Sequence, residues 1–117
     1  MKRLLQLGML IVIITGAAFA QTRAYDTPAC GHALAFSDTV KPFMDNLLPQ
    51  AKAAPTKSQK MFLLGEATEL SDDLSAVLAV CHISDSAEAA RAYQAATGRY
   101  EADLQTFAVK AKRMGIK

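Results

Sequence analysis

The chain has 117 residues, 51% of them hydrophobic and 21% charged, with no tryptophan and a formal net charge of +2. This length favours a single domain, and the nearly balanced charge excludes the strong positive field typical of nucleic-acid-binding proteins. The sequence also lacks phosphate-binding glycine loops, G-x-S-x-G and H-E-x-x-H motifs, calcium-binding loops and C-x-x-C pairs. We therefore predict a protein that is not an enzyme and needs no cofactor.

The N-terminal segment has the three parts of an export signal. Lys2 and Arg3 supply a positive start, residues 4–14 are apolar, and the small-x-small triplet A-F-A follows. The alternative is a retained membrane anchor, but the apolar run is shorter than the roughly 20 residues that a spanning helix needs. We predict that residues 1–20 are a signal peptide cleaved after Ala20. The mature chain then carries 11 basic and 11 acidic residues.

Two cysteines, Cys30 and Cys81, follow the predicted signal. An even pair of cysteines in an exported chain predicts a disulfide, the alternative being two free buried thiols. Closing a loop of about 50 residues contributes roughly 4 kcal/mol in the chain-entropy description, a large share of the stability of a small domain.

The first helical region follows a flexible lead-in predicted at residues 21–28. From about residue 29 to residue 48 apolar side chains recur at helical spacing. Because a proline inside a helix removes a hydrogen bond and clashes with the preceding turn, Pro42 predicts a break near residues 37–39 and a second helix beginning just before Pro42. Residues 49–55 are the predicted connector. The apolar residues of this region are Phe36, Val40, Phe43, Met44, Leu47 and Leu48.

Thr56 and Gln59 form a capping box that predicts the start of the next helix. Apolar residues then step by four and three along one seam, namely Leu63, Ala67, Leu70, Leu74, Val77 and Cys81. Four acidic residues face elsewhere, namely Glu66, Glu69, Asp72 and Asp73. We interpret these acids as a solvated helix face, with a metal or acid–base cluster as the alternative.

Asp85 and Glu88 form a second capping box, which predicts a long last helix. Its expected apolar stripe comprises Ala90, Tyr93, Thr97, Tyr100, Leu104, Phe107, Ala111 and Met114. Positive charge crowds its end at Lys110, Lys112, Arg113 and Lys117. We interpret these charges as complements of the helix dipole, with an anionic surface or partner as the alternative.

If the first two helical regions run antiparallel, Cys30 and Cys81 lie at the same end of the hairpin. We therefore predict an all-α, single-domain helical bundle over residues 29–117, stapled by one disulfide. Each cysteine also has a histidine close by, His32 and His82, so that a zinc or copper site is an alternative use of the four side chains. The disulfide consumes the thiolates that such a site needs, and we predict no metal.

The stretch C-G-H-A-L-A-F-S-D-T-V-K-P resembles the opening motif of the HdeA/HdeB family of small periplasmic acid-stress chaperones. The resemblance lies in Cys30, in a leucine and an alanine four and five residues later, and in Pro42. It continues at A-V-L-A-V-C-H-I-S-D-S-A-E around Cys81 and covers residues 30–91. It implies a periplasmic homodimer at neutral pH. From the charge balance and the short apolar run we also predict no bound nucleic acid and no stable membrane insertion.

The resemblance further implies that acid loosens the fold and exposes apolar surface that holds unfolded periplasmic clients. Protonating all 11 carboxylates and both histidines moves the net charge of the mature chain from about 0 to about +13. The candidate surface for clients and for the dimer is Phe36, Val40, Phe43, Met44, Leu47 and Leu48. Two alternatives remain, a periplasmic interaction or inhibitor protein without a pH switch and a carrier of metal on the Cys-His pairs.

Overall fold

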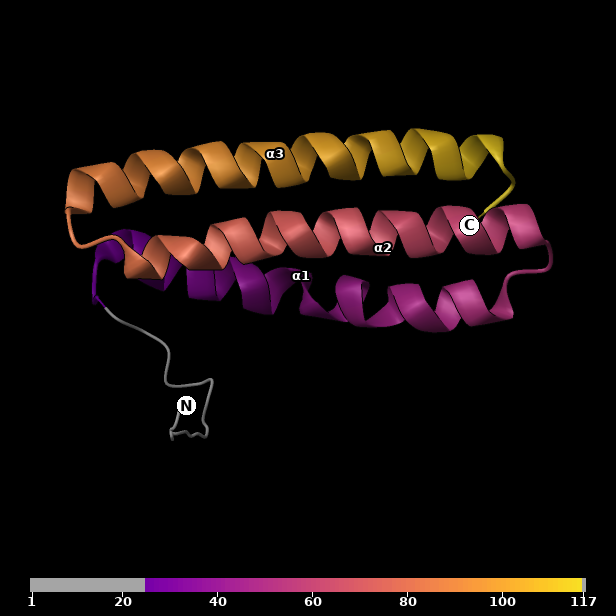
Figure 1. Cartoon of the computed structure of the whole chain (residues 1–117), viewed down its shortest axis with the longest axis horizontal. Helices are drawn as coiled ribbons and strands as arrows, with labels where there is room; N and C mark the ends of the chain where they lie inside the picture. The colour runs from indigo at the N-terminus through magenta and orange to yellow at the C-terminus, as the bar shows by residue number, and fades with distance from the viewer. Residues whose placement is uncertain (1–24, 117) are drawn as a thin grey trace.

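Three antiparallel helices make up the computed structural model, which describes residues 25–116 (Figure 1). Helix α1 spans Pro28–Ala53, α2 spans Lys57–Leu78 and α3 spans Ser86–Arg113, with a short 3₁₀ helix, η1, at Ala79–His82. Within this part of the chain no strand occurs, and the predicted all-α bundle is confirmed. None of the described helices combines the length and the apolar character that crossing a membrane requires. The predicted signal peptide lies outside the described residues.

Each of the three α-helices begins at a side chain that caps one of its first backbone amides. The hydroxyl of Thr56 accepts a hydrogen bond from the N–H of Gln59 at 3.1 Å, and the carboxylate of Asp85 accepts one from the N–H of Glu88 at 2.8 Å. Both predicted helix starts are therefore confirmed. Helix α1 has a cap of the same kind at Thr27, followed by Pro28 in the first turn, where a missing N–H is harmless.

Helix α1 continues through both of its prolines, so the predicted break near residues 37–39 is wrong. The predicted connector is also too long, because α1 continues to residue 53 and only residues 54–56 separate it from α2. Pro42 and Pro49 both lie on the exposed side of α1. Water can therefore solvate the carbonyls that they leave without partners, while the opposite side of the helix packs against α2 and α3.

Aromatic contacts join the helices in the middle and toward the connector end of the bundle. Phe36 of α1 meets Tyr100 of α3 edge-on, with ring centroids 5.2 Å apart. Phe107 of α3 contacts Phe43 edge-on at 5.8 Å and stacks on Phe62 at 5.7 Å. These contacts belong to a hydrophobic core cluster, whose buried side chains are Leu47, Ala51, Leu63, Leu70, Tyr100, Phe107 and Ala111. The apolar seam predicted for α2 therefore faces the core. The apolar stripe of α3 starts one residue earlier than predicted, because Ala89 is buried and Ala90 is exposed.

The opposite end of the bundle is closed by the predicted disulfide. Cys30 of α1 and Cys81 of η1 are bonded, with Cα atoms 4.5 Å apart across a sequence separation of 51. A second core cluster at this end consists of small buried side chains, which let the helices approach closely, namely Ala29, Ala33, Val77, Val80, Ala89 and Ala96. The N–H of Tyr25 donates to the carbonyl of Cys81 at 3.1 Å, which fixes the chain just before α1.

Candidate functional site

The apolar run predicted as a client or dimer surface lies partly in the core of the folded chain. Leu47 is buried, whereas Leu48 is 50% exposed. The other four members, Phe36, Val40, Phe43 and Met44, are half-buried and pack against the core cluster. Helix α3 covers much of the run, since the Tyr100 hydroxyl donates to the sulfur of Met44 at 3.2 Å. Full exposure of the run therefore requires α3 to move away.

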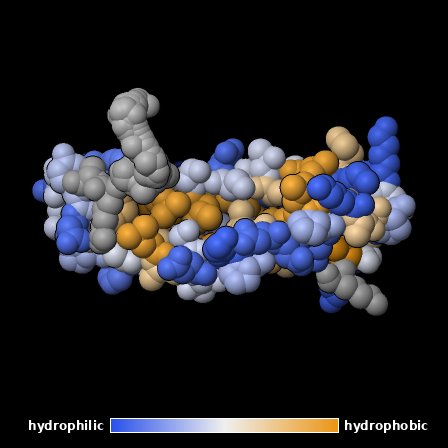
Figure 2. All heavy atoms as spheres, turned by 90° about the horizontal axis from the view of Figure 1, so that it is seen from below, coloured by the Kyte–Doolittle hydropathy of each residue, from blue (hydrophilic) through white to orange (hydrophobic). Residues whose placement is uncertain are grey.

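Leu48 and part of Met44 are accessible without any rearrangement, whereas Leu47 lies at the base of the same surface. Met44, Leu47 and Leu48 line an open groove of about 410 Å³ between α1 and α2. Its other wall comes from α2, and consists of Leu64, Ala67, Thr68, Ser71 and Asp72. Leu64 is 38% exposed. Figure 2 views the molecule from the α1 side and shows hydrophobic side chains gathered in two areas along its length, between hydrophilic ones. The groove offers apolar contact area, with polar groups at one side.

A buried carboxylate lies at the interface of α2 with α3, where the sequence predicts only a solvated face. Asp73 is 5% exposed, and its Oδ2 atom has no hydrogen-bond partner among the described residues. Burial raises the pKa of Asp73 to about 6, helped by a side-chain hydrogen bond to Asp103 and by the charges of Asp103 and Glu69. Arg99 opposes the rise. The prediction of a solvated face is therefore wrong for Asp73.

Glu66 lies two helical turns before Asp73 and repeats its situation in a milder form. The side chain is half-buried, and its Oε1 atom has no partner among the residues that the structure describes. Burial raises the pKa of Glu66, as do the nearby Glu69 and Asp103, while Lys110 lowers it. Glu69 and Asp72, the other two acids of α2, are exposed as predicted.

Both raised pKa values have the same consequence for the stability of the fold. A carboxyl group whose pKa is higher in the folded than in the unfolded chain favours folding when it is protonated. For Asp73 this contribution is complete below the unfolded value of 3.8 and is lost as the pH rises through about 6. Mild acid therefore strengthens the contact between α2 and α3.

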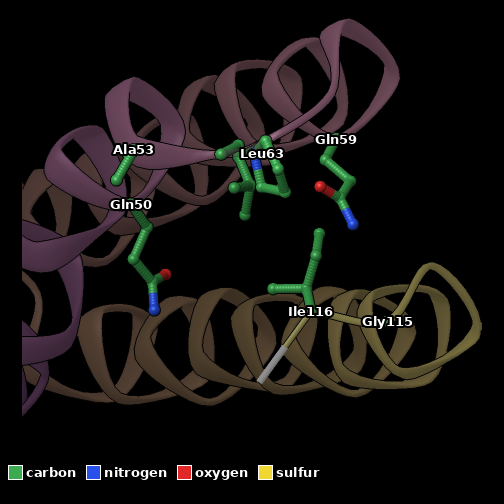
Figure 3. Close-up of a pocket in the computed structure, with 8 residues that line it drawn as sticks. Gln50, Ala53, Gln59, Leu63, Gly115 and Ile116 are labelled. Atoms are coloured by element: carbon green, nitrogen blue, oxygen red, sulfur yellow. The ribbon is translucent and has the colours of Figure 1, made fainter.

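A small pocket lies at the end of the bundle away from the disulfide, where the α1–α2 connector lies beside the residues that follow α3. It measures about 250 Å³ and is lined mainly by apolar atoms of Ala53, Ala54, Pro55, Leu63 and Ile116, together with Gln50, Gln59 and Gly115. Figure 3 shows Ile116 pointing from the end of α3 toward Leu63 and Gln59. The side-chain N–H of Gln59 donates to the carbonyl of Met114 at 2.8 Å. Gly115, with φ of 79°, makes the turn that brings Ile116 back.

The histidines lie near the disulfide end, and both are exposed. The ring of His32 lies 5.9 Å from that of Tyr93 on α3. Across residues 25–116 no group of three or more histidine, cysteine or acidic side chains is placed to hold a metal ion. Because the disulfide occupies both sulfurs, a metal carrier would have to bind through the histidines alone.

Comparison with known proteins adds no relative. The chain matches no protein-family model, no curated protein and no solved structure.

Proposed function

We propose that this protein is an exported, periplasmic chaperone-like protein that holds apolar segments of unfolded clients in acid. The observation that supports this function best is the open apolar groove between α1 and α2, with Leu48 and Leu64 partly exposed along it. A groove between two helices that is lined partly by apolar side chains offers contact area for the apolar side chains of another polypeptide. The groove includes half of the apolar run that follows Cys30, and the resemblance of that region to acid-stress chaperones supports the same function.

The client-holding state in this proposal is the folded bundle, not a loosened chain. The buried carboxyl group of Asp73 and the half-buried one of Glu66 favour the packed α2–α3 interface when they are protonated. Mild acid therefore opposes the departure of α3 that full exposure of the apolar run requires. The groove, by contrast, needs no such departure.

Acid also affects the solubility of the complexes through their overall charge. As the 11 carboxylates are protonated, the protein and any client bound to it become increasingly cationic. Mutual repulsion then keeps the complexes from aggregating with one another.

Suppression of client aggregation at acid and neutral pH tests this function. We expect the wild-type protein to suppress aggregation of an exported client near pH 4 and less at pH 7. Leu48→Ser reduces the apolar area of the groove, so we expect it to weaken suppression several-fold at unchanged helix content. Leu34→Ser is the matched control, because Leu34 lies on α1, is 39% exposed and is not among the residues that line the groove.

Each outcome separates the candidate functions. Suppression that Leu48→Ser and Leu34→Ser impair equally would contradict the groove as the client surface. Suppression at neither pH would contradict the chaperone and favour an interaction or inhibitor protein without a pH switch. The same variants test the homodimer proposed for neutral pH, since light scattering should report a smaller mass for Leu48→Ser if the groove is also the dimer contact.

A further inference from the structure

Charge is strongly segregated along the bundle. Residues 48–64 and 106–116 contain six basic residues and no acidic one. The other described residues, 25–47 and 65–105, contain three basic residues and all 11 acidic ones. The six basic residues are Lys52, Lys57, Lys60, Lys110, Lys112 and Arg113. A mature chain with almost no net charge therefore has a strongly cationic end.

The fold brings these six residues to one place. Because the helices are antiparallel, the end of α1, the start of α2 and the end of α3 lie together at the connector end of the bundle (Figure 1). The hydrogen bond from Gln59 to the carbonyl of Met114 links the first turn of α2 directly to the end of α3. Ile116, which lines the pocket there with Leu63, adds an apolar contact (Figure 3). We call the six basic side chains the cationic end.

Helix dipoles account for only part of this cluster. Lys52, Lys110, Lys112 and Arg113 lie in the last turns of α1 and α3, where positive charge is favourable. Lys57 and Lys60, however, lie in the first turn of α2, where positive charge is unfavourable and no acidic residue compensates it. None of the six forms an ion pair within the described chain, although Lys110 influences Glu66 from a distance. Lys57 and Lys60 are therefore free to contact an external anion.

Exposed apolar side chains lie among these charges. Met61 is 60% exposed and Val109 is 51% exposed, each within about one helical turn of the cationic end. Phosphate contacts with a nucleic acid would use the basic side chains and leave these aliphatic side chains in water. A membrane interface uses both, because lysines contact lipid phosphates while neighbouring apolar side chains enter the boundary between headgroups and acyl chains.

We propose that the cationic end docks the protein peripherally on the surface of an anionic phospholipid membrane, with the bundle axis pointing away from the lipid. The lysines and Arg113 contact headgroup phosphates, and Met61 and Val109 enter the interface. None of the helices in residues 25–116 is inserted across the bilayer. This docking is independent of the proposed client binding, since the groove between α1 and α2 remains accessible.

Flotation with lipid vesicles tests the proposal, using protein purified after export with its N-terminus determined. We expect the protein to float with vesicles that contain phosphatidylglycerol, to remain behind with pure phosphatidylcholine, and to be released at high salt. Lys57→Gln with Lys60→Gln should lower the partition coefficient about fivefold for each charge removed. Lys41→Gln with Arg91→Gln removes the same charge outside the cationic end and should change it less than twofold.

Three results would overturn the proposal. The first is failure of the wild-type protein to float with anionic vesicles at low salt. The second is an equal loss of flotation in the two pairs of variants, because that would make the overall charge responsible. The third is equal binding to a DNA duplex at the same phosphate concentration. Met61→Gln adds a separate readout, since it should weaken flotation without changing its salt dependence.

Discussion

At the scale of single residues, Asp73 is the side chain whose environment departs furthest from what its chemistry favours. It lies one position before Leu74 on α2 and beside the contact with α3, where Asp103 shares a hydrogen bond with it. A buried carboxylate without a full set of hydrogen bonds costs free energy, whereas the protonated form can donate to its neighbour. Protonation of Asp73 therefore removes part of the free-energy cost of burying this side chain between α2 and α3.

Asp73→Asn is expected to stabilise the protein at neutral pH, because it replaces the carboxylate with a neutral group of the same shape. The gain should be of the order of 2 kcal/mol at pH 7 and should vanish near pH 4. Urea unfolding at pH 4, 5.5 and 7 measures it. Asp72→Asn, on the exposed face, is the control and should leave the pH dependence of wild type intact. If the free energy of unfolding depends on pH equally in wild type and Asp73→Asn, protonation of Asp73 does not cause that dependence.

The sequence pattern could predict the seam of α2 but not the burial of Asp73. Leu63, Leu70 and Val77 follow the period of an amphipathic helix, and the structure buries all three. An aspartate beside that seam is normally solvated, and the seam alone does not show how wide a face α3 will cover. The same limit applies to the groove, since Leu48 and Leu64 are apolar like the core residues around them but lie partly outside it.

At the scale of whole elements, the caps were predictable and the continuity of α1 was not. Thr56 and Asp85 each act on an amide three residues away, so short-range sequence contains the whole interaction. The course of α1 past Pro42 depends on packing against two other helices, which no local pattern records. The groove and the pocket likewise depend on how helices meet.

Replacing Pro42 with alanine is expected to stabilise the protein, because it restores a hydrogen bond to the carbonyl of Asp38 and removes a steric clash. A gain of about 1 kcal/mol or more in the free energy of unfolding is expected, measured by urea titration at pH 7. Pro55→Ala serves as the control, since that proline lies in the connector and restricts the unfolded chain. It should be neutral or slightly destabilising. A loss of stability in Pro42→Ala would mean that the bundle requires a bend in α1.

At the scale of the whole molecule, the two ends of the bundle differ in their chemistry. The disulfide end is covalently closed and lined by small side chains, whereas the connector end is cationic and contains the pocket. The pairing of the cysteines was predictable because an antiparallel hairpin returns the chain to its starting end. The gathering of positive charge was not, since Lys57 and Lys60 lie far in sequence from Lys110 and Arg113 and meet them only in the folded bundle.

Removing the disulfide is expected to destabilise the molecule as a whole and to loosen its closed end first. Replacing Cys30 and Cys81 with serine should cost about 2–4 kcal/mol, because the unfolded chain regains the freedom that a bridge across 51 residues removes. Urea unfolding measures the loss, and a reducing agent should lower the stability of wild type but not of the variant.

Hydrogen exchange in the variant should accelerate more at residues 29–33 and 77–81 than around Phe43, Phe62 and Phe107, because the aromatic contacts hold that part of the bundle without the bridge. Uniform acceleration along all three helices would show instead that the bundle opens only as a single cooperative unit.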